Sequence, residues 1–349
     1  MKTRYNTRLT GFRNGLLLCL IFIGFALHAE TKYAVIVGIG HQPTDTKWKN
    51  TTGDKDAVVM RDLLKKQGFD SLIMLTNEQA TKSNVTGALN QAIKSLQAGD
   101  IFVFHYAGHG QQIEDDNNED IDGLDEALAL YGAPSRYDNW YRFENHLRDD
   151  EFSEIIDRMR AKLGDRGEVL IITDAGFGTE NSTGSDSIRG GAKAFVPAEF
   201  SQAGRYMDIS AGIYEDRPFG MPANSVAPIV TISASLTHQV ACEFGGNGAL
   251  TRAFERAMEK YTVKTTYEDL FNLIVANFKE MNLTQFPVME GFYDMRAFRN
   301  ATVSAMSMDW NSFTDNQADL KILQNLSNRV NNTHLLQQME IEPRLKALF

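Results

Sequence analysis

The sequence predicts an α/β protein in three layers, with a mainly parallel central sheet between two layers of helices. Short apolar runs rich in β-branched and aromatic residues alternate with segments of helical periodicity. This alternation is typical of a parallel sheet that is covered on both faces. The residue types that carry chemistry follow these runs, and the carboxyl ends of parallel strands are where such sheets bind ligands.

We expect strands at 33–37, 72–75, 101–106, 169–172 and 229–233. Between the first two, Ala57, Met60 and Leu64 recur at helical spacing, and a similar pattern fills 85–96. The first half is therefore predicted as strand, helix, strand, helix, strand. Residues 303–349 are expected to form a helical C-terminal extension, which packs on its own domain or binds a partner.

Residues 1–29 have the pattern of a secretory signal peptide. Four basic residues precede an apolar run at 15–27, which is shorter than the roughly 20 residues that a membrane-spanning helix needs. We therefore expect an exported protein, periplasmic or secreted, with no membrane span after the signal is removed. Cys242 is the one cysteine left after cleavage, so the exported chain is expected to form no intramolecular disulfide.

The charge of the expected exported chain is strongly negative. Removal of residues 1–29 takes away four basic and no acidic side chains, which leaves 31 basic against 45 acidic residues. Nucleic acid attracts proteins of the opposite balance, so it is not an expected partner. A peptide or protein with basic side chains fits this charge better.

Two histidines mark the end of the third expected strand, in His105-Tyr-Ala-Gly-His-Gly110. His105 lies inside the strand and is expected to be structural. His109 is flanked by glycines at a strand end, where an imidazole can serve as a base toward a cysteine nucleophile. A satisfied structural histidine is an equally good interpretation of His109 taken alone.

Several segments in order resemble the caspase-like clan (peptidase C14), nearest to metacaspases and orthocaspases. They are Tyr33-Ala-Val-Ile-Val-Gly-Ile39, Lys55-Asp-Ala57, His105-Tyr-Ala-Gly-His-Gly-Gln111, Asp174-Ala-Gly-Phe-Gly178 and Ser233-Ala-Ser-Leu-Thr-His-Gln-Val-Ala-Cys-Glu243. The resemblance implies a caspase-like domain over 31–302, with His109 as the histidine of the catalytic dyad.

The resemblance also implies a missing nucleophile. The family pattern Asp-x-Cys-His-Ser-Gly corresponds here to Asp174-Ala-Gly-Phe-Gly-Thr179, so Gly176 occupies the cysteine position. Glycine offers no nucleophile, and the chain is expected to be a pseudopeptidase that binds a peptide or protein. The alternative is an active hydrolase that uses His109 with a displaced nucleophile, such as Cys242, Thr173, Thr179 or Ser182.

By resemblance, Asp56 and Asp174, with Ser233, line a pocket for an arginine or lysine side chain. Asp174 capping a turn and Asp56 starting a helix are the alternatives. A third hypothesis for the whole chain is an assembly role through the C-terminal extension, with the groove filled by the protein's own loop. Residues 165–191, above all 179–191, are rich in Gly, Ser, Asp and Asn and predict a mobile surface loop after the strand at 169–172.

Acidic residues cluster in 115–126. An EF-hand is rejected because Ala129 stands at the twelfth position, where the loop needs a bidentate glutamate. The resemblance to metacaspases implies calcium as the one candidate cofactor, held by Asp125, Asp149 and Asp150. A solvated acidic loop is the alternative interpretation.

Overall fold

The structure is a computed structural model, and it describes residues 30–115, 123–178, 188–198, 213–214 and 225–298. The expected signal peptide and the expected C-terminal extension lie outside these residues. The chain divides into residues 1–30 and a compact unit that begins at Thr31.

A six-stranded sheet forms the centre of the unit, in the order β12-β9-β7-β3-β1-β2. All neighbours are parallel except β12 with β9. The strands are β1 (Lys32–Gly38), β2 (Ser71–Thr76), β3 (Ile101–Ala107), β7 (Glu168–Asp174), β9 (Ile229–Ser233) and β12 (Val288–Gly291). All five predicted parallel strands are present. Strands β3 and β7 are buried along their whole length, which explains their continuous apolar character.

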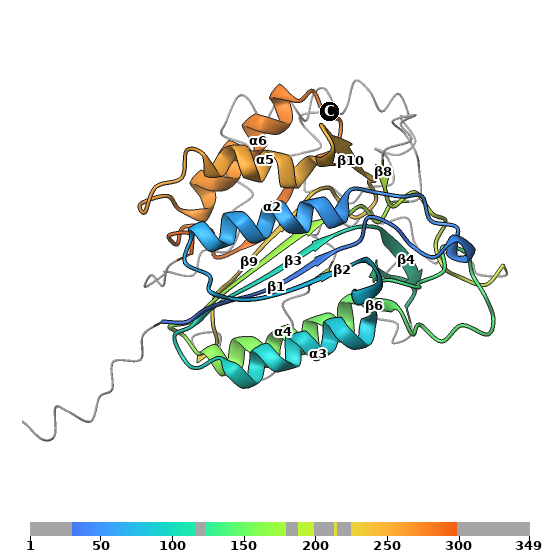
Figure 1. Cartoon of the computed structure of the whole chain (residues 1–349), viewed down its shortest axis with the longest axis horizontal. Helices are drawn as coiled ribbons and strands as arrows, with labels where there is room; N and C mark the ends of the chain where they lie inside the picture. The colour runs from blue at the N-terminus through green and yellow to red at the C-terminus, as the bar shows by residue number, and fades with distance from the viewer. Residues whose placement is uncertain (1–29, 116–122, 179–187, 199–212, 215–224, 299–349) are drawn as a thin grey trace, which may run out of the picture. The chain divides into compact units, whose positions relative to one another are not determined.

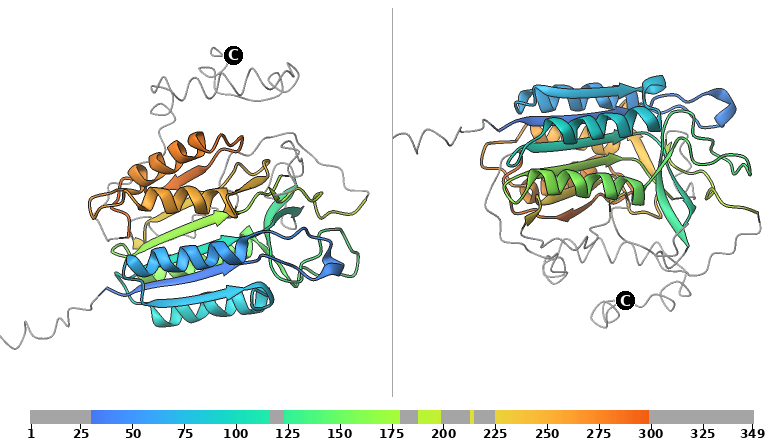
Figure 2. Two further views of the ribbon diagram at one scale, coloured as in Figure 1. Left: turned by 45° about the horizontal axis from the view of Figure 1, so that its top comes forward. Right: turned by 90° about the horizontal axis from the view of Figure 1, so that it is seen from below.

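Two helical layers cover the sheet (Figures 1 and 2). On one face α2 (Gly53–Lys66), α5 (Ala249–Met258) and α6 (Tyr267–Glu280) contribute to one apolar core. On the other face α3 (Lys82–Ser95) and α4 (Asp149–Leu163) contribute to a second core. The predicted three-layer α/β/α class is therefore confirmed. Within the described residues, no helix is both long and apolar enough to cross a membrane.

Two small sheets complete the unit near the carboxyl ends of the parallel strands (Figure 1). One has the order β4-β5-β6, and the other has the order β11-β10-β8. Their strands are β4 (Gly110–Glu114), β5 (Leu124–Ala129), β6 (His146–Arg148), β8 (Ile188–Arg189), β10 (Ala241–Phe244) and β11 (Asn247–Gly248), and two short 3₁₀ turns are η1 (Thr44–Thr46) and η2 (Asn77–Gln79). These two small sheets were not among the elements predicted from the sequence. They supply most of the walls of the site.

Candidate functional site

The carboxyl ends of β3 and β7 bring His109 and Gly176 into one region. The two strands pair in register down to Ala107 and Asp174. Beyond that pair, the Gly108 amide still donates to the Asp174 carbonyl, at 3.3 Å. His109 and Gly176 each follow their strand by two residues, so the sheet itself sets their position.

Both ring nitrogens of His109 are engaged. Its Nε2 lies 2.8 Å from the carbonyl oxygen of Lys49, so Nε2 carries the hydrogen, and Nδ1 accepts from the Gly190 amide at 3.1 Å. The indole of Trp48 stacks on the ring at 4.4 Å between centroids. Burial lowers the pKa of His109 to about 4, with the charge of Arg189 acting in the same direction and the bond to Lys49 against it. The imidazole is therefore neutral at pH 7 and has no free nitrogen to serve as a base.

Gly176 lies where the backbone leaves no room for a side chain. A Cβ placed on it would lie 2.2 Å from the Ala241 nitrogen, 2.6 Å from the Val240 carbonyl carbon and 2.7 Å from the Arg189 carbonyl oxygen. All three are backbone atoms, which cannot swing away as a flexible side chain can. The next residue, Phe177, is buried in the apolar core. In this conformation the backbone around Gly176 therefore leaves no space for a side chain.

Asp56, Asp174 and Glu243 surround the guanidinium of Arg189, and all four side chains are buried or nearly so. Nη2 of Arg189 pairs with Asp56 and, at 3.3 Å, with Glu243. Nη1 pairs with the Asp174 carboxylate at 3.2 Å and donates to its backbone carbonyl at 2.9 Å. Asp56, Asp174 and Glu243 thus form an acidic pocket. The basic side chain inside it is Arg189 of the same chain.

Backbone and side-chain donors fix the carboxylates of this acidic pocket. Asp56, in the first turn of α2, accepts from Asn247 at 2.7 Å and from the Gly248 amide at 3.1 Å. Asp174 accepts from the amide and the hydroxyl of Thr251 at the start of α5, both at 2.7 Å. A helix N-terminus attracts acidic side chains, so α2 and α5 both help to hold Asp56 and Asp174 in place.

Three acidic side chains face one guanidinium in the acidic pocket. Burial raises the pKa of Asp174, and the nearby Asp56 adds to the rise, while Arg189 and Thr251 oppose it. The pKa of Arg189 is raised because the attraction of Asp174 and Asp56 outweighs the cost of burial. The acidic pocket therefore binds a guanidinium in its charged form.

Comparison with known proteins agrees with this architecture. The caspase domain model of peptidase family C14 matches residues 31–298. The chain belongs to this family. Metacaspase-1 of Arabidopsis thaliana is 28% identical over 256 residues, or 69% of this chain and 63% of that protein. Metacaspase-2 of the same plant is 37% identical over 105 residues, or 28% of this chain and 25% of that protein.

The caspase domain thus spans less than two thirds of the length of these relatives. A crystal structure of a Geobacter sulfurreducens protein aligns with a TM-score of 0.54 at 21% identity, over 77% of this chain and 99% of that one. At that identity the likeness supports the fold alone.

The other predicted site residues have neighbours other than Arg189. Ser233, buried, ends β9 opposite Thr173 of β7. Asp125 pairs with Arg148, and Asp149 accepts from the Asp150 amide at 2.9 Å at the start of α4. Among the described residues no three or more His, Cys, Asp or Glu side chains gather to hold a metal ion. Residues 116–122 of the acidic segment lie outside that set, so calcium stays a prediction.

Cys242 is an unsuitable nucleophile in this arrangement. It lies in β10, and its side chain packs with Ile188 and Val240 in a small apolar cluster. Burial, followed by the charge of Asp174, raises the pKa of its thiol. The reactive thiolate is disfavoured accordingly. Thr173 is fully buried in β7, and Thr179 and Ser182 lie outside the described residues.

The predicted surface loop needs a correction. Ile188, Arg189 and Gly190 are buried, and the first two form β8 against β10. The prediction failed there because the composition of 179–191 is typical of a loop, and a two-residue strand leaves no periodic pattern. Arg189 and Glu243 are the functional side chains that sequence reasoning missed. The available signal was that Arg189 is the one basic residue of the segment 179–191.

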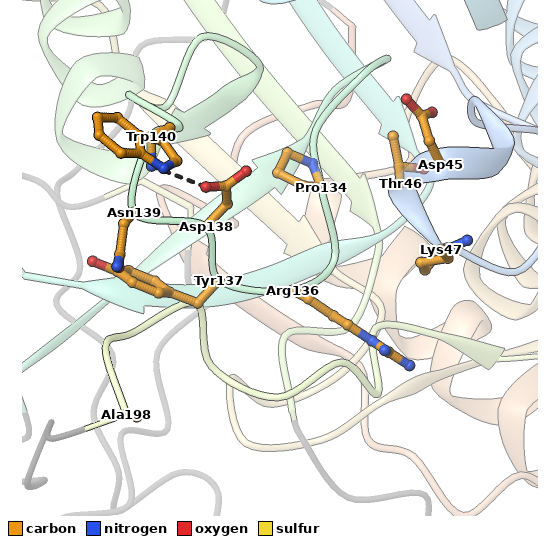
Figure 3. A pocket seen from close by; sticks show the side chains of 10 residues that line it. All are labelled: Asp45, Thr46, Lys47, Pro134, Arg136, Tyr137, Asp138, Asn139, Trp140 and Ala198. Atoms are coloured by element: carbon orange, nitrogen blue, oxygen red, sulfur yellow. Dashed lines mark hydrogen bonds between the residues drawn. The ribbon is translucent and has the colours of Figure 1, made fainter.

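An open cavity lies beside this region, between the 45–47 turn and the 134–140 loop (Figure 3). It has a volume of about 630 Å³, and its lining includes Tyr137, Trp140 and Ala198. The Trp140 side chain is 85% exposed. The 45–47 turn is joined to the 134–140 loop by two bonds from Ser135 to the Thr46 carbonyl, at 2.8 and 2.9 Å.

Proposed function

We propose that this chain is an exported caspase-domain pseudopeptidase that binds an arginine- or lysine-bearing peptide segment without cutting it. One observation carries the proposal: the Arg189 guanidinium sits between Asp56, Asp174 and Glu243 while the following peptide bond faces His109 and Gly176. That is the pose of a substrate in a peptidase that lacks its nucleophile. Arg189 is the resident ligand, and a partner's basic residue is its competitor.

Peptidase chemistry at this site would need a thiolate and an available base. Gly176 supplies no thiol, and His109 is neutral, buried and bonded at both nitrogens. The backbone amides of the site remain, but an oxyanion pocket without a nucleophile gives little turnover. Binding is the property that these residues still support.

Absence of turnover is tested with arginine- and lysine-terminated fluorogenic peptides, with and without calcium, on the natural chain and on His109→Ala. We expect no hydrolysis above buffer from either protein. Hydrolysis that the His109→Ala change abolishes would overturn the proposal and favour the rival hypothesis, an active hydrolase with a displaced nucleophile.

Binding is tested on an Arg189→Ala chain, whose acidic pocket lacks its resident side chain. We expect N-acetylarginine amide to raise the melting temperature of this variant and to leave the natural chain unchanged. N-acetylcitrulline amide is the matched control, because it is close in shape but carries no positive charge. Equal effects of the two compounds would show that the carboxylates do not recognise charge.

A second candidate function is an assembly role through residues 303–349, with the groove closed by the chain itself. The position of Arg189 favours it, since that hypothesis expects a groove filled from within. Deletion of residues 303–349 separates the two functions. It abolishes partner binding if the extension carries it, and leaves arginine binding unchanged if the acidic pocket does.

Export is part of the proposal and rests on residues 1–29. Expression of the full chain should give a mature protein shortened at its N-terminus, in the periplasmic or the culture fraction. An intact N-terminus in the cytoplasmic fraction would contradict this. Mass spectrometry of each fraction decides the question.

A further inference from the structure

The chain segment that carries Arg189 has a second attachment six residues later. We call residues 188–195 the strap. At its start, β8 pairs with β10 through Ala241 and Cys242. At its end, the Phe195 amide donates to the Gln112 carbonyl at 2.8 Å, and Phe195 forms a parallel bridge with Ile113. The strap therefore runs from one small sheet to the other.

The second attachment uses a free sheet edge. Among the residues that the structure describes, no strand of this sheet pairs with the second side of β4, and the end of the strap forms its bridge to Ile113 of β4. An extended peptide that adds to such an edge gains main-chain hydrogen bonds, while pockets for individual side chains give specificity. This is a recurring way in which proteins bind peptides.

Phe195 fills an aromatic pocket beside this edge. Its ring is fully buried, and its centroid lies 5.1–5.7 Å from those of four surrounding rings. These belong to Tyr137, Tyr141, Phe143 and His146, and together they define the aromatic pocket. Tilted and edge-to-face contacts at such distances are favourable beyond the burial of area. An aromatic side chain is what this pocket selects.

Gln111 holds the strap between its two anchors by the backbone alone. Its Nε2 donates to the carbonyl of Lys193 at 2.7 Å and to that of Ser135 at 3.0 Å, and its Oε1 accepts from His146 at 2.9 Å. A hydrogen bond to a backbone carbonyl does not depend on the side chain of that residue. The residues between the two anchors are Gly-Gly-Ala-Lys-Ala, so the anchors carry the selectivity.

We propose that the acidic and aromatic pockets form one peptide-docking groove, which selects a segment with a basic residue and an aromatic residue six positions later. The strap is the resident occupant, and a partner segment with the same pair replaces it. This inference rests on the proposed function for its first anchor. Past Phe195 the path reaches Ala198 at the open cavity beside Trp140, so a longer partner segment has room to continue there (Figure 3).

The test uses a labelled peptide of residues 188–197 and a full chain with Arg189→Ala and Phe195→Ala, which vacates both anchors. We expect the peptide to bind this double variant. The natural chain should bind it far more weakly, because its own strap competes at a millimolar effective concentration. Fluorescence anisotropy measures both affinities.

Three altered peptides locate the selectivity: alanine for the arginine, alanine for the phenylalanine, and one glycine removed to shorten the spacing. Each altered peptide should lose about tenfold or more in affinity. The two alanine peptides lose a large buried side chain, and the shortened peptide cannot fill both pockets at once. If the arginine matters but the phenylalanine and the spacing do not, the aromatic anchor is overturned and the proposed function stands. If no peptide binds the folded double variant, both fail.

Folding of the double variant is checked by its thermal transition. Should it not fold, the same peptides are titrated against the single Arg189→Ala chain, in which a bound peptide must still displace Phe195. A phenylalanine-dependent affinity supports the groove there too, and equal affinity of the parent and alanine peptides overturns it.

Discussion

At the scale of single residues, the site is organised around one buried cation. Arg189 is fully buried, and its guanidinium faces Asp56, Asp174 and Glu243. A buried ion pair adds little net stability compared with apolar residues, but loss of one partner leaves an uncompensated charge. Arg189 is therefore more important for this site than its loop-like sequence context suggests.

Replacement of Arg189 by methionine should lower the free energy of unfolding by about 3–5 kcal/mol, because three carboxylates would remain buried without their cation. Arg61→Met is the matched control, since Arg61 pairs with Asp62 at the surface, and it should cause no measurable change. Urea denaturation at pH 7.5 measures both. Equal stability of the two variants would contradict the role assigned to Arg189.

Introduction of cysteine at Gly176 should not restore peptidase activity. The new Cβ would meet backbone atoms of Val240 and Ala241, and overpacking of this kind costs about 1–3 kcal/mol. Gly176→Ala should lose as much stability, since it adds the same Cβ. A Gly176→Cys chain that cleaves itself after Arg189, detected by mass spectrometry, would show that the site had kept its catalytic geometry.

Sequence reasoning reached some of these residues and not others, for a physical reason. Asp56, Asp174 and His109 were placed in one site by the resemblance to the caspase-like clan, because each lies in a segment that matches the family pattern. Arg189 meets Asp56 from 133 residues away, through a two-residue strand in a glycine-rich stretch. No local periodicity encodes such a contact.

At the scale of elements, the acidic pocket depends on the N-terminus of α5. Gly248 precedes this helix, and its amide donates to Asp56. A Cβ on Gly248 would lie 2.2 Å from Oδ2 of Asp174 and 2.3 Å from Nη1 of Arg189. The close approach of this backbone to the guanidinium therefore requires glycine.

Gly248→Ala should displace the Arg189 side chain and destabilise the fold by roughly 1–3 kcal/mol. Gly87→Ala is the matched control, because Gly87 lies in α3 with nothing within 4 Å of a new Cβ. Alanine there should stabilise by up to about 1 kcal/mol through helix propensity. Opposite signs in thermal unfolding confirm the argument, and a neutral Gly248→Ala would contradict it.

The parallel strands were predictable as elements and the small sheets were not. Strands such as β3 and β7 are buried on both faces and read as unbroken apolar runs. Strands β8 and β11 have two residues each, and β4 carries two glutamines. Their pairing depends on the rest of the fold, so the sequence around them has no strand signal of its own.

At the scale of the whole molecule, two helical layers bury the sheet and with it three histidines. His105 lies within β3, His109 follows it, and His146 lies in β6 and forms part of the aromatic pocket. Burial lowers the pKa of His105 and His109 to about 4 and that of His146 to about 3. The fold therefore binds these rings in their neutral form.

This burial makes the stability of the protein depend on pH in one direction. In the unfolded chain these histidines take up protons near pH 6.5, whereas in the folded chain they stay neutral down to about pH 4. Their contribution is complete above pH 6.5 and is lost as the pH falls toward 4. Each histidine changes the free energy of unfolding by up to about 1.4 kcal/mol per pH unit in that window. The raised pKa of Asp174 acts in the opposite sense.

Comparison of variants isolates the histidine contribution. His146→Gln removes one buried imidazole, which takes up a proton on unfolding. The fall in unfolding free energy between pH 7 and pH 5, measured in urea, should therefore be smaller by the contribution of about one proton. His41→Gln serves for comparison, since it replaces an imidazole whose side chain is 46% exposed. Protonation of His109 in the folded chain removes the acceptor of the Gly190 amide, so the strap should loosen as the pH falls toward about 4. An equal pH dependence in the natural chain and His146→Gln would mean that other groups govern acid unfolding.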